Sequence, residues 1–290
     1  MGIREAEPPV ASLLKYSGKY IMHRIYFPSL MGQKKPGLDL TCKYLYKLFG
    51  NRGTLIKTRN SDVEPRTKLL SENLHKLFNA NVQCKKPTIN IGGDHSMAIA
   101  TIGASLEKHG SALKVIWFDA HADINTRKTS PSGNYHGMPL AFLTGLESDY
   151  DLFPFLYTVP DLKFENILYL GIRDLDNGEK LVLKEKKIRY IKSKEINENP
   201  KEVYTKIKEF VGKDPLHFSF DVDGLDPEEM SSTGTTAKAG VQTKAIKTIV
   251  DKIMRNMNVV NMDITEFNLE LGNQDTSMKN FTKLFEKYLK

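Results

Sequence analysis

The feature that most constrains the fold is a regular alternation of short apolar runs with segments of helical periodicity. The apolar runs have the length of buried strands and lie at 88–91, 114–118, 167–170, 188–191, 216–220 and 258–262. Helical patterns lie between or after them, at 97–109, 137–144, 178–184, 200–211, 243–256 and 277–289. Because parallel strands are joined by crossover helices, this alternation predicts an α/β domain with a mostly parallel sheet and helices on both faces.

The same pattern continues more weakly toward the N-terminus. Strands are expected at 20–27 and 54–57, and helices at 38–49 and 64–80. These additions bring the sheet to about eight strands. A chain of 290 residues is long enough for one large domain or two ordinary ones. The unbroken alternation favours a single domain over 1–290, with residues 1–18 expected to form a loosely attached leader.

Composition excludes several classes of protein. Apolar residues at 40% and charged residues at 27% are typical of a soluble globular chain. No apolar run approaches the roughly 18 residues that a membrane helix needs, and no apolar core of a signal peptide follows the first residues. Cys42 and Cys84 are far apart, which favours free thiols in a reducing compartment over a disulfide. We therefore expect a cytoplasmic protein with no membrane partner.

The net charge of +7 raises the question of an anionic partner. The densest basic segment, at 184–194, is flanked by Glu185 and Glu195 and interrupted by apolar residues as a strand would be. This pattern is typical of a solvated lysine-rich surface. We therefore expect no nucleic-acid partner.

Polar clusters follow four of the predicted strands. They are Gly-Gly-Asp-His-Ser at 92–96, Asp-Ala-His-Ala-Asp-Ile-Asn at 119–125, Asp-Val-Asp-Gly-Leu-Asp-Pro at 221–227 and Asp-Ile-Thr-Glu at 263–266. Chemistry in a parallel sheet collects at the carboxyl ends of its strands. Asp119, His121 and Asp123 alternate along the chain, so an extended backbone would project all three to one side.

Each cluster alone has an ordinary structural explanation. Residues 119–125 could be a polar loop that caps a strand, His95 a loop histidine, and Asp221 with Asp223 a turn held by side-chain hydrogen bonds. Glu266 could cap a helix. Together, however, the clusters gather two histidines and four aspartates, a concentration that is costly in a fold core unless cations join it. Four carboxylates could neutralise two divalent ions, and the oxygen-rich set with imidazoles suits manganese.

Three of these motifs, in this order and spacing, resemble the metal motifs of the ureohydrolases, the family of arginases, agmatinases and their relatives. The motifs are those at 92–96, at 119–125 and at 219–227, where the last reads Ser-Phe-Asp-Val-Asp-Gly-Leu-Asp-Pro. The resemblance runs from about residue 88 to the end of the chain. It implies a three-layer α/β/α fold and a cofactor of two Mn²⁺ ions per chain.

By motif position, the resemblance assigns the metal ligands to two ions. One ion would be held by His95, Asp119, Asp123 and Asp221. The other would be held by His121, Asp119, Asp221 and Asp223, so Asp119 and Asp221 would bridge the two. Two neighbouring metals can share one water and lower its pKa toward neutrality, which makes hydroxide available as a nucleophile.

The resemblance also implies an activity and its catalytic residues. It points to the hydrolysis of L-arginine to L-ornithine and urea by attack of the metal-bridged hydroxide on the guanidinium carbon. Asp123 would steady the hydroxide and pass its proton to the departing amine. Glu266 would hold the guanidinium through a charge-assisted pair, and His136 would shuttle protons at the mouth of the cleft.

The loop at 126–137 is expected to decide between substrates. Its second half reads Ser-Gly-Asn-Tyr-His-Gly at 132–137 and resembles the loop of the arginases. By that resemblance, Asn125, Ser132 and Asn134 would bind the α-carboxylate of the substrate. Asp176 would face the α-amino group with Glu179 nearby, although Asp176 could also be an ordinary acid at a helix start. Thr235 would line the cleft.

Two other functions stay open at this point. An agmatinase or another guanidino-compound ureohydrolase would use the same metals, but agmatine lacks the carboxylate that the loop would bind. An inactive, metal-free arginase-like binding protein would have lost ligands, whereas all six ligand positions are filled here. By family precedent the small-molecule enzyme is expected to form a homotrimer.

Overall fold

The computed structural model describes residues 22–61 and 63–290, so the leader expected at 1–18 and the first residues of the strand expected at 20–27 lie outside the described residues. Eight strands occur in the described part: β1 His23–Tyr26, β2 Thr54–Leu55, β3 Thr88–Ile91, β4 Lys114–Phe118, β5 Ile167–Leu170, β6 Arg189–Ile191, β7 Leu216–Asp221 and β8 Val259–Thr265. They form one sheet in the order β2-β1-β3-β8-β7-β4-β5-β6, and every pairing is parallel. The expected α/β sheet is confirmed.

Nine α-helices connect the strands in the same described ranges. They are α1 Leu38–Leu48, α2 Arg66–Gln83, α3 Met97–His109, α4 Pro139–Leu143, α5 Asn177–Glu185, α6 Ser193–Glu198, α7 Pro200–Val211, α8 Thr243–Asn256 and α9 Gln274–Leu289. Eight of them match predicted helices. Helix α6 was not predicted from the sequence. It has six residues and buries only Ser193 and Ile196, which are too few to show a helical period. Within these ranges no helix is both long and apolar enough to cross a bilayer.

Several boundaries differ from the expectations, among them those of α2, α9 and β2, and two of the differences lie near the candidate site. The helix expected at 137–144 is shorter, Pro139–Leu143, and a 3-10 turn at Tyr135–Gly137 precedes it. The last strand was expected to end at 262, but β8 continues to Thr265. Asp263, expected to follow the strand as part of a polar cluster, lies inside it. In the fold its carboxylate accepts hydrogen bonds from buried side chains, so the strand tolerates it.

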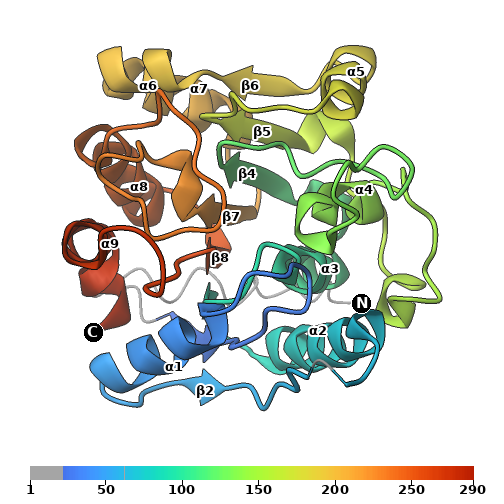
Figure 1. Ribbon diagram of the computed structural model, residues 1–290. Coiled ribbons are helices and arrows are strands. Elements are labelled where there is room, and N and C mark those ends of the chain that lie inside the picture. The colour runs from blue at the N-terminus through green and yellow to red at the C-terminus, as the bar shows by residue number, and fades with distance from the viewer. Residues whose placement is uncertain (1–21, 62) are drawn as a thin grey trace, which may run out of the picture.

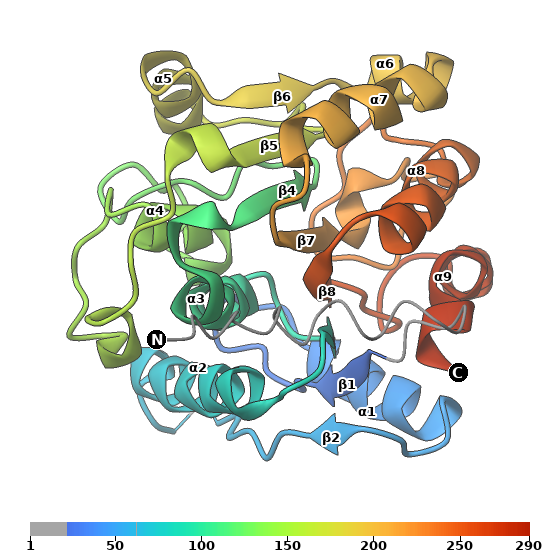
Figure 2. The same ribbon diagram turned by 180° about the vertical axis from the view of Figure 1, so that it is seen from behind.

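Helices cover both faces of the sheet and make three layers (Figure 1). The helices α1, α7, α8 and α9 lie on one face, and α2, α3 and α4 lie on the other, as the view from behind also shows (Figure 2). Side chains of β4 alternate between the two cores: Ile116 and Phe118 belong to one buried cluster, Val115 and Trp117 to the other. This alternation is the period of two that a strand buried on both faces requires.

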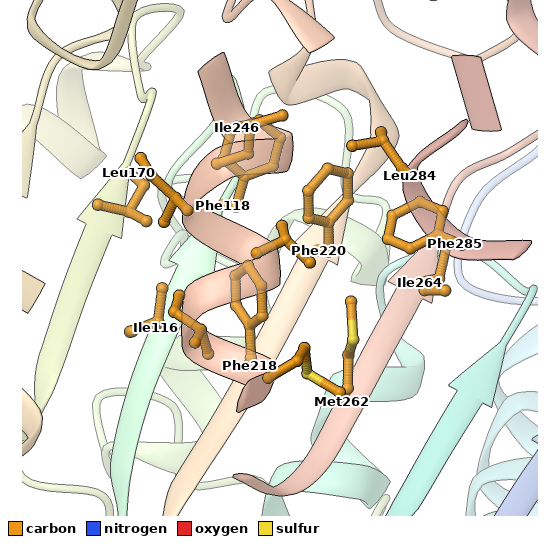
Figure 3. Close-up of a cluster of buried hydrophobic side chains, with 14 of the residues drawn as sticks. Ile116, Phe118, Leu170, Phe218, Phe220, Ile246, Met262, Ile264, Leu284 and Phe285 are labelled. Atoms are coloured by element: carbon orange, nitrogen blue, oxygen red, sulfur yellow. The ribbon is translucent and has the colours of Figure 1, made fainter. Parts of the chain in front are cut away.

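The first of these cores is rich in aromatic rings (Figure 3). Phe118 of β4 stacks on Phe220 of β7 with ring centroids 4.3 Å apart, and Phe285 of α9 meets Phe220 edge-on at 5.0 Å. Ile246 of α8 closes the cluster from above the sheet. Truncating a buried ring of this kind costs about 3–5 kcal/mol of stability. The packing therefore fixes the carboxyl ends of β4 and β7 relative to each other.

The strand order places four strand ends side by side at the centre of the sheet. In the register, Ile91 of β3 pairs with Ile264 of β8, and Phe118 of β4 pairs with Phe220 of β7. All strands point the same way, so the polar residues that follow β3, β4, β7 and β8 emerge at one edge. This edge is where the candidate site lies.

Candidate metal centre

The imidazole of His95 faces three carboxylates. Its Nδ1 lies 3.1 Å from Asp119 Oδ2, 3.1 Å from Asp123 Oδ2 and 3.0 Å from Asp221 Oδ2. All four side chains are buried, and His95 and Asp119 are at most 1% exposed. Despite these short distances, Nδ1 makes no hydrogen bond within the described part of the chain. A buried acceptor atom surrounded by oxygens is what a cation site requires.

A second group lies beside the first and shares Asp119 with it. The Nδ1 of His121 lies 3.3 Å from Asp119 Oδ1 and 3.2 Å from Asp223 Oδ2. Asp119 therefore presents one oxygen to His95 and the other to His121. The Nε2 of His121 is buried without a hydrogen-bond partner among residues 22–61 and 63–290, and the nearest carboxylate is that of Asp174, 3.7 Å away.

Short backbone contacts hold the ligand loops in place. The amide of His121 donates to Asp119 Oδ1 at 2.7 Å, that of Asp223 donates to Asp221 Oδ1 at 2.8 Å, and that of Ala120 donates to Asp223 Oδ1 at 3.2 Å. Asp123 has a positive φ of 49°, a conformation that costs free energy in a residue other than glycine. The surrounding bonds therefore hold the loop at 119–125 in a shape that it would not adopt alone.

The tight approach of the first ligand loop needs glycine. Gly92 has φ of +90°, and a Cβ there would lie 2.5 Å from the Sγ of Cys42. No other residue could enter this turn without displacing helix α1. The turn at the Gly-Gly pair therefore places His95 just beyond the end of β3.

Two positioning side chains were missed by the sequence analysis. Trp117 donates from Nε1 to Asp119 Oδ2 at 2.9 Å, and its ring stacks on that of His95 with centroids 4.0 Å apart. The Oγ of Ser219 lies 2.9 Å from His95 Nε2. Both stand two residues before an aspartate of the site, on the same face of their strands. That period-two spacing was a signal available in the sequence.

Burial and mutual repulsion shift the carboxyl groups in opposite directions. Burial, together with the charge of Asp119, raises the pKa of Asp123, and it raises the pKa of Asp223 to about 7. The pKa of Asp221 also lies well above its ordinary value because of burial and the charge of Asp223. Burial opposes ionisation of Asp119 as well, but hydrogen bonds and charges from His121 and His95 outweigh it and lower its pKa. Divalent cations would supply the positive charge that these carboxylates otherwise take up as protons.

The donor set therefore fits two divalent cations. His95, Asp119 and Asp221 form one group whose ligand atoms lie within 4.8 Å of one another, and Asp119, His121 and Asp223 form a second. Asp123 is outside both groups but contacts His95 Nδ1. Asp119 is common to the two groups. Asp221 belongs to only one of them, so its expected bridging role remains a prediction.

Glu266 and His136 lie next to this centre. Glu266 Oε1 accepts a hydrogen bond from the amide of His95 at 2.9 Å and lies 3.2 Å from His136 Nδ1. Burial disfavours the charged form of His136, but the bond with Glu266 outweighs it and raises the pKa of His136 to about 9. The side chain of His136 is 27% exposed, so this imidazole connects the buried centre with solvent.

The residues expected to bind the amino-acid end lie farther out. Asn125 donates from Nδ2 to Asp176 Oδ2 at 2.8 Å. Asp176 caps the N-terminus of α5 in a capping box with Glu179, so the alternative of a helix-start acid also describes its position. Glu179 is buried, and burial with the charge of Asp123 raises its pKa to about 8.

Three further candidates stand apart from the metal ligands. The Oγ of Ser132 accepts from the amide of Asn134 at 3.2 Å, and Ser132 and Thr235 are exposed. In the described ranges, no side-chain hydrogen bond joins Ser132, Asn134 or Thr235 to a metal ligand. The structure thus groups the six ligands with Glu266 and His136, and it leaves these three at the periphery.

Comparison with known proteins gives consistent results. Residues 39–289 match the model of the arginase family. The arginase of Entamoeba histolytica is 33% identical over 285 residues, which are 89% of this chain and 94% of that protein. The arginase of Plasmodium berghei is 39% identical over 215 residues, 72% of this chain. A crystal structure of the Entamoeba histolytica arginase in complex with L-ornithine superimposes with a TM-score of 0.83 at 29% identity, covering 93% of this chain and 99% of that one.

The matches differ in how much of each relative they cover. The matched region makes up 60% of the Plasmodium berghei arginase and 62% and 59% of the arginases of Emericella nidulans and Neurospora crassa. The Entamoeba histolytica match, in contrast, spans nearly all of both proteins. In chain order, the residues matched by the family model include strands β2 to β8 and all six candidate ligands. This chain belongs to the arginase family.

Proposed function

We propose that this protein is a manganese arginase that hydrolyses L-arginine to L-ornithine and urea. The observation that carries the proposal is the convergence of two histidines and four aspartates, all but His121 buried, at the carboxyl ends of β3, β4 and β7. Membership of the arginase family supports it. So does the match to a relative whose crystal structure contains L-ornithine, the product that the proposed reaction would leave.

Two Mn²⁺ ions per chain are proposed as the cofactor. His95, Asp119, Asp123 and Asp221 would hold one ion, and His121, Asp119, Asp221 and Asp223 would hold the other. When bound, the ions supply Lewis acidity and lower the pKa of a water that they share. The four carboxylates match the charge of two divalent ions, and a set of oxygens with imidazoles suits manganese.

Glu266 is proposed to orient the guanidinium of the substrate. Its Oε1 accepts a hydrogen bond from the amide of His95, while Oε2 is turned toward Gly234. A charge-assisted pair with a planar guanidinium would fix the carbon to be attacked. Asp123, which contacts His95 on the same side, would accept a proton and pass it to the departing nitrogen.

His136 is proposed to exchange protons between this site and solvent. It is the most exposed imidazole of the site, and its contact with Glu266 keeps it beside the reacting group. With a pKa of about 9 it carries a proton near neutral pH, so it can donate one to the leaving amine.

The amino-acid end of L-arginine is proposed to bind on the outer loops. Asn125, Ser132 and Asn134 would donate to the α-carboxylate without adding charge that repels the guanidinium. Asp176 would pair with the α-amino group, and its bond to Asn125 already joins the two halves of this subsite. Glu179 would support Asp176 through the capping box, and Thr235 would line the opposite wall.

One assay tests the proposal: urea release by the purified protein from L-arginine and from agmatine, with and without added manganese. We expect manganese-dependent release that is faster from L-arginine. Faster release from agmatine would make the protein an agmatinase. No release from either guanidino compound would favour an inactive, arginase-like binding protein.

The assembly and location expected from the sequence remain predictions. A homotrimer is proposed from family membership, and light scattering of the purified protein would test it. A cytoplasmic location is proposed from composition and the two free cysteines.

A further inference from the structure

The side chain of Arg173 makes an unusual set of contacts on the loop after β5. Every nitrogen of its guanidinium donates to main-chain carbonyls, and together they reach six of them. The acceptors are Lys238 O at 3.0 Å for Nε, Gly171 O at 3.0 Å and Gly224 O at 3.1 Å for Nη1, and Asp223 O at 3.0 Å, Leu225 O at 3.2 Å and Ala237 O at 2.9 Å for Nη2.

These contacts join loops that come from different strands. The carbonyls at 223–225 follow β7 and include that of the candidate ligand Asp223. Those at 237 and 238 lie two and three residues beyond Thr235. The backbone amides of Arg173 and Asp174 both donate to Ala120 O, at 2.8 and 3.0 Å, which ties in the loop after β4. One residue thus connects the metal loops with the proposed substrate wall.

The geometry suits arginine and no other residue. A guanidinium is a rigid planar fork with five N–H donors, whereas a lysine ammonium is a point donor with three. The carbonyls at 223–225 lie at the end of the 3-10 turn Val222–Gly224, and among them Gly224 O also accepts from the amide of Val241 at 3.0 Å. Without Arg173 the backbone that carries Asp223 would lose its main fixed donor.

We propose that Arg173 is a positioning residue that holds the backbone of Asp223 in place and links the second ligand group to the loop that bears Thr235. The metal half of this inference concerns the group of Asp119, His121 and Asp223 and is testable without any turnover. The substrate half rests on the proposed function.

The test uses Arg173→Met in the full chain. After chelator treatment, Mn²⁺ alone is titrated into the protein by calorimetry. We expect one ion to bind as in the wild type and the second to bind about 10–100-fold more weakly, the usual effect of removing an outer partner of a metal ligand. At saturating manganese, KM for L-arginine should stay raised while kcat recovers most of its value.

Arg24→Met is the matched control. Arg24 also donates its guanidinium to main-chain carbonyls, those of Leu289 and Lys290, but it lies at the other end of the sheet. This variant should bind both ions with wild-type affinity. Arg173→Lys should be intermediate, because an ammonium can satisfy at most three of the six carbonyls.

Two ions bound by Arg173→Met with wild-type affinities would overturn the proposal, as would an equal weakening of both ions. If circular dichroism shows that Arg173→Met does not fold, Arg173→Lys decides, and unchanged binding of the second ion would then overturn it. If the wild type binds manganese but releases no urea, the proposed function is wrong. The titration would still test the positioning role of Arg173.

Discussion

Two buried polar clusters lie next to each other in this protein, and only one of them leaves histidine nitrogens without partners in the described ranges. The first, here called the metal group, is formed by the six candidate ligands described above. The second, here called the asparagine network, lies under the middle of strands β3, β7 and β8 and consists of Asn81, Asn90, Thr101, Ser105, His217, Asn261 and Asp263. Both clusters are almost fully buried and both pair histidine with aspartate, so burial and residue type do not separate them.

Hydrogen-bond balance does separate them. In the asparagine network, His217 bonds Asp263 through Nε2 and Ser105 through Nδ1, each at 2.9 Å, and Asp263 also accepts from Thr101 and Asn90. The metal group has four carboxylates and too few donors, and it leaves nitrogens of both histidines without partners in the described ranges. An excess of buried acceptors, rather than burial of polar groups, marks the site for cations.

The pKa shifts repeat this contrast. Burial opposes ionisation of Asp263, but the charge and hydrogen bond of His217 outweigh it and lower the pKa below the ordinary 3.8. The corresponding acid of the metal group, Asp221, has its pKa raised by burial and by its neighbours. Ser219 stands between the clusters, with its Oγ 2.9 Å from His95 Nε2 and 3.4 Å from Asp263 Oδ2.

The largest effect is expected from Asp119→Asn. Asp119 is shared by both ligand groups, so the variant should bind fewer than two Mn²⁺ ions and lose urea formation on the order of 10⁴-fold or more. Atomic absorption and the urea assay measure the two effects. Asp263→Asn is the matched control, since the same change in the asparagine network should keep both ions. Full metal content in Asp119→Asn would remove the distinction between the clusters.

The next effect is expected from His136→Ala. This side chain contacts Glu266 but no metal ligand, so the variant should keep both ions and lose about 10²–10⁴-fold in kcat if it transfers protons. The check is a profile of kcat against pH beside metal analysis. An unchanged profile would exclude the shuttle role, and a loss of metal would move His136 into the metal group.

Asp263→Asn should reduce stability rather than metal binding. The change removes a buried charge that bonds four side chains, which should lower the free energy of unfolding by about 1–3 kcal/mol. Chemical denaturation with manganese in excess measures this. Equal stability, together with lost metal, would mean that the network serves the site and not the fold.

The smallest effect concerns acid stability. Because Asp263 has a lowered pKa in the folded state, it contributes stability that is present above about pH 4 and is lost as the pH falls through its folded pKa. Chelator-treated wild type should therefore lose stability more steeply than Asp263→Asn as the pH falls below about 4. Denaturation curves at stepped pH give both slopes, and identical slopes would show that Asp263 titrates normally.

The strand ends and the positions of the six candidate ligands could be predicted because they depend on local pattern. Alternation along 115–118 marks a strand buried on both faces. The extended backbone expected for Asp119, His121 and Asp123 is wrong, because β4 ends at Phe118 and Asp123 has a positive φ of 49°, but the loop still brings the three side chains to the site. The asparagine network could not be predicted, since Asn90 meets Asp263 only through the pairing of β3 with β8. The same strand pairing explains why β8 runs past 262.

The role of Arg173 could not be predicted from the sequence. Its role depends on carbonyls at 223–225 and 237–238, which approach it through the sheet order and not through spacing along the chain. The outer residues Ser132, Asn134 and Thr235 remain predictions for a related reason. They lie on loops whose contacts would be made with a substrate and not with the rest of the protein.

The central claim is that the metal group is built for two ions while the asparagine network is complete without any. Calorimetric titration of Mn²⁺ into chelator-treated wild type tests it most directly. We expect saturation at two ions per chain, unchanged in Asp263→Asn and reduced in Asp119→Asn. Saturation at one ion, or no binding at all, would contradict it.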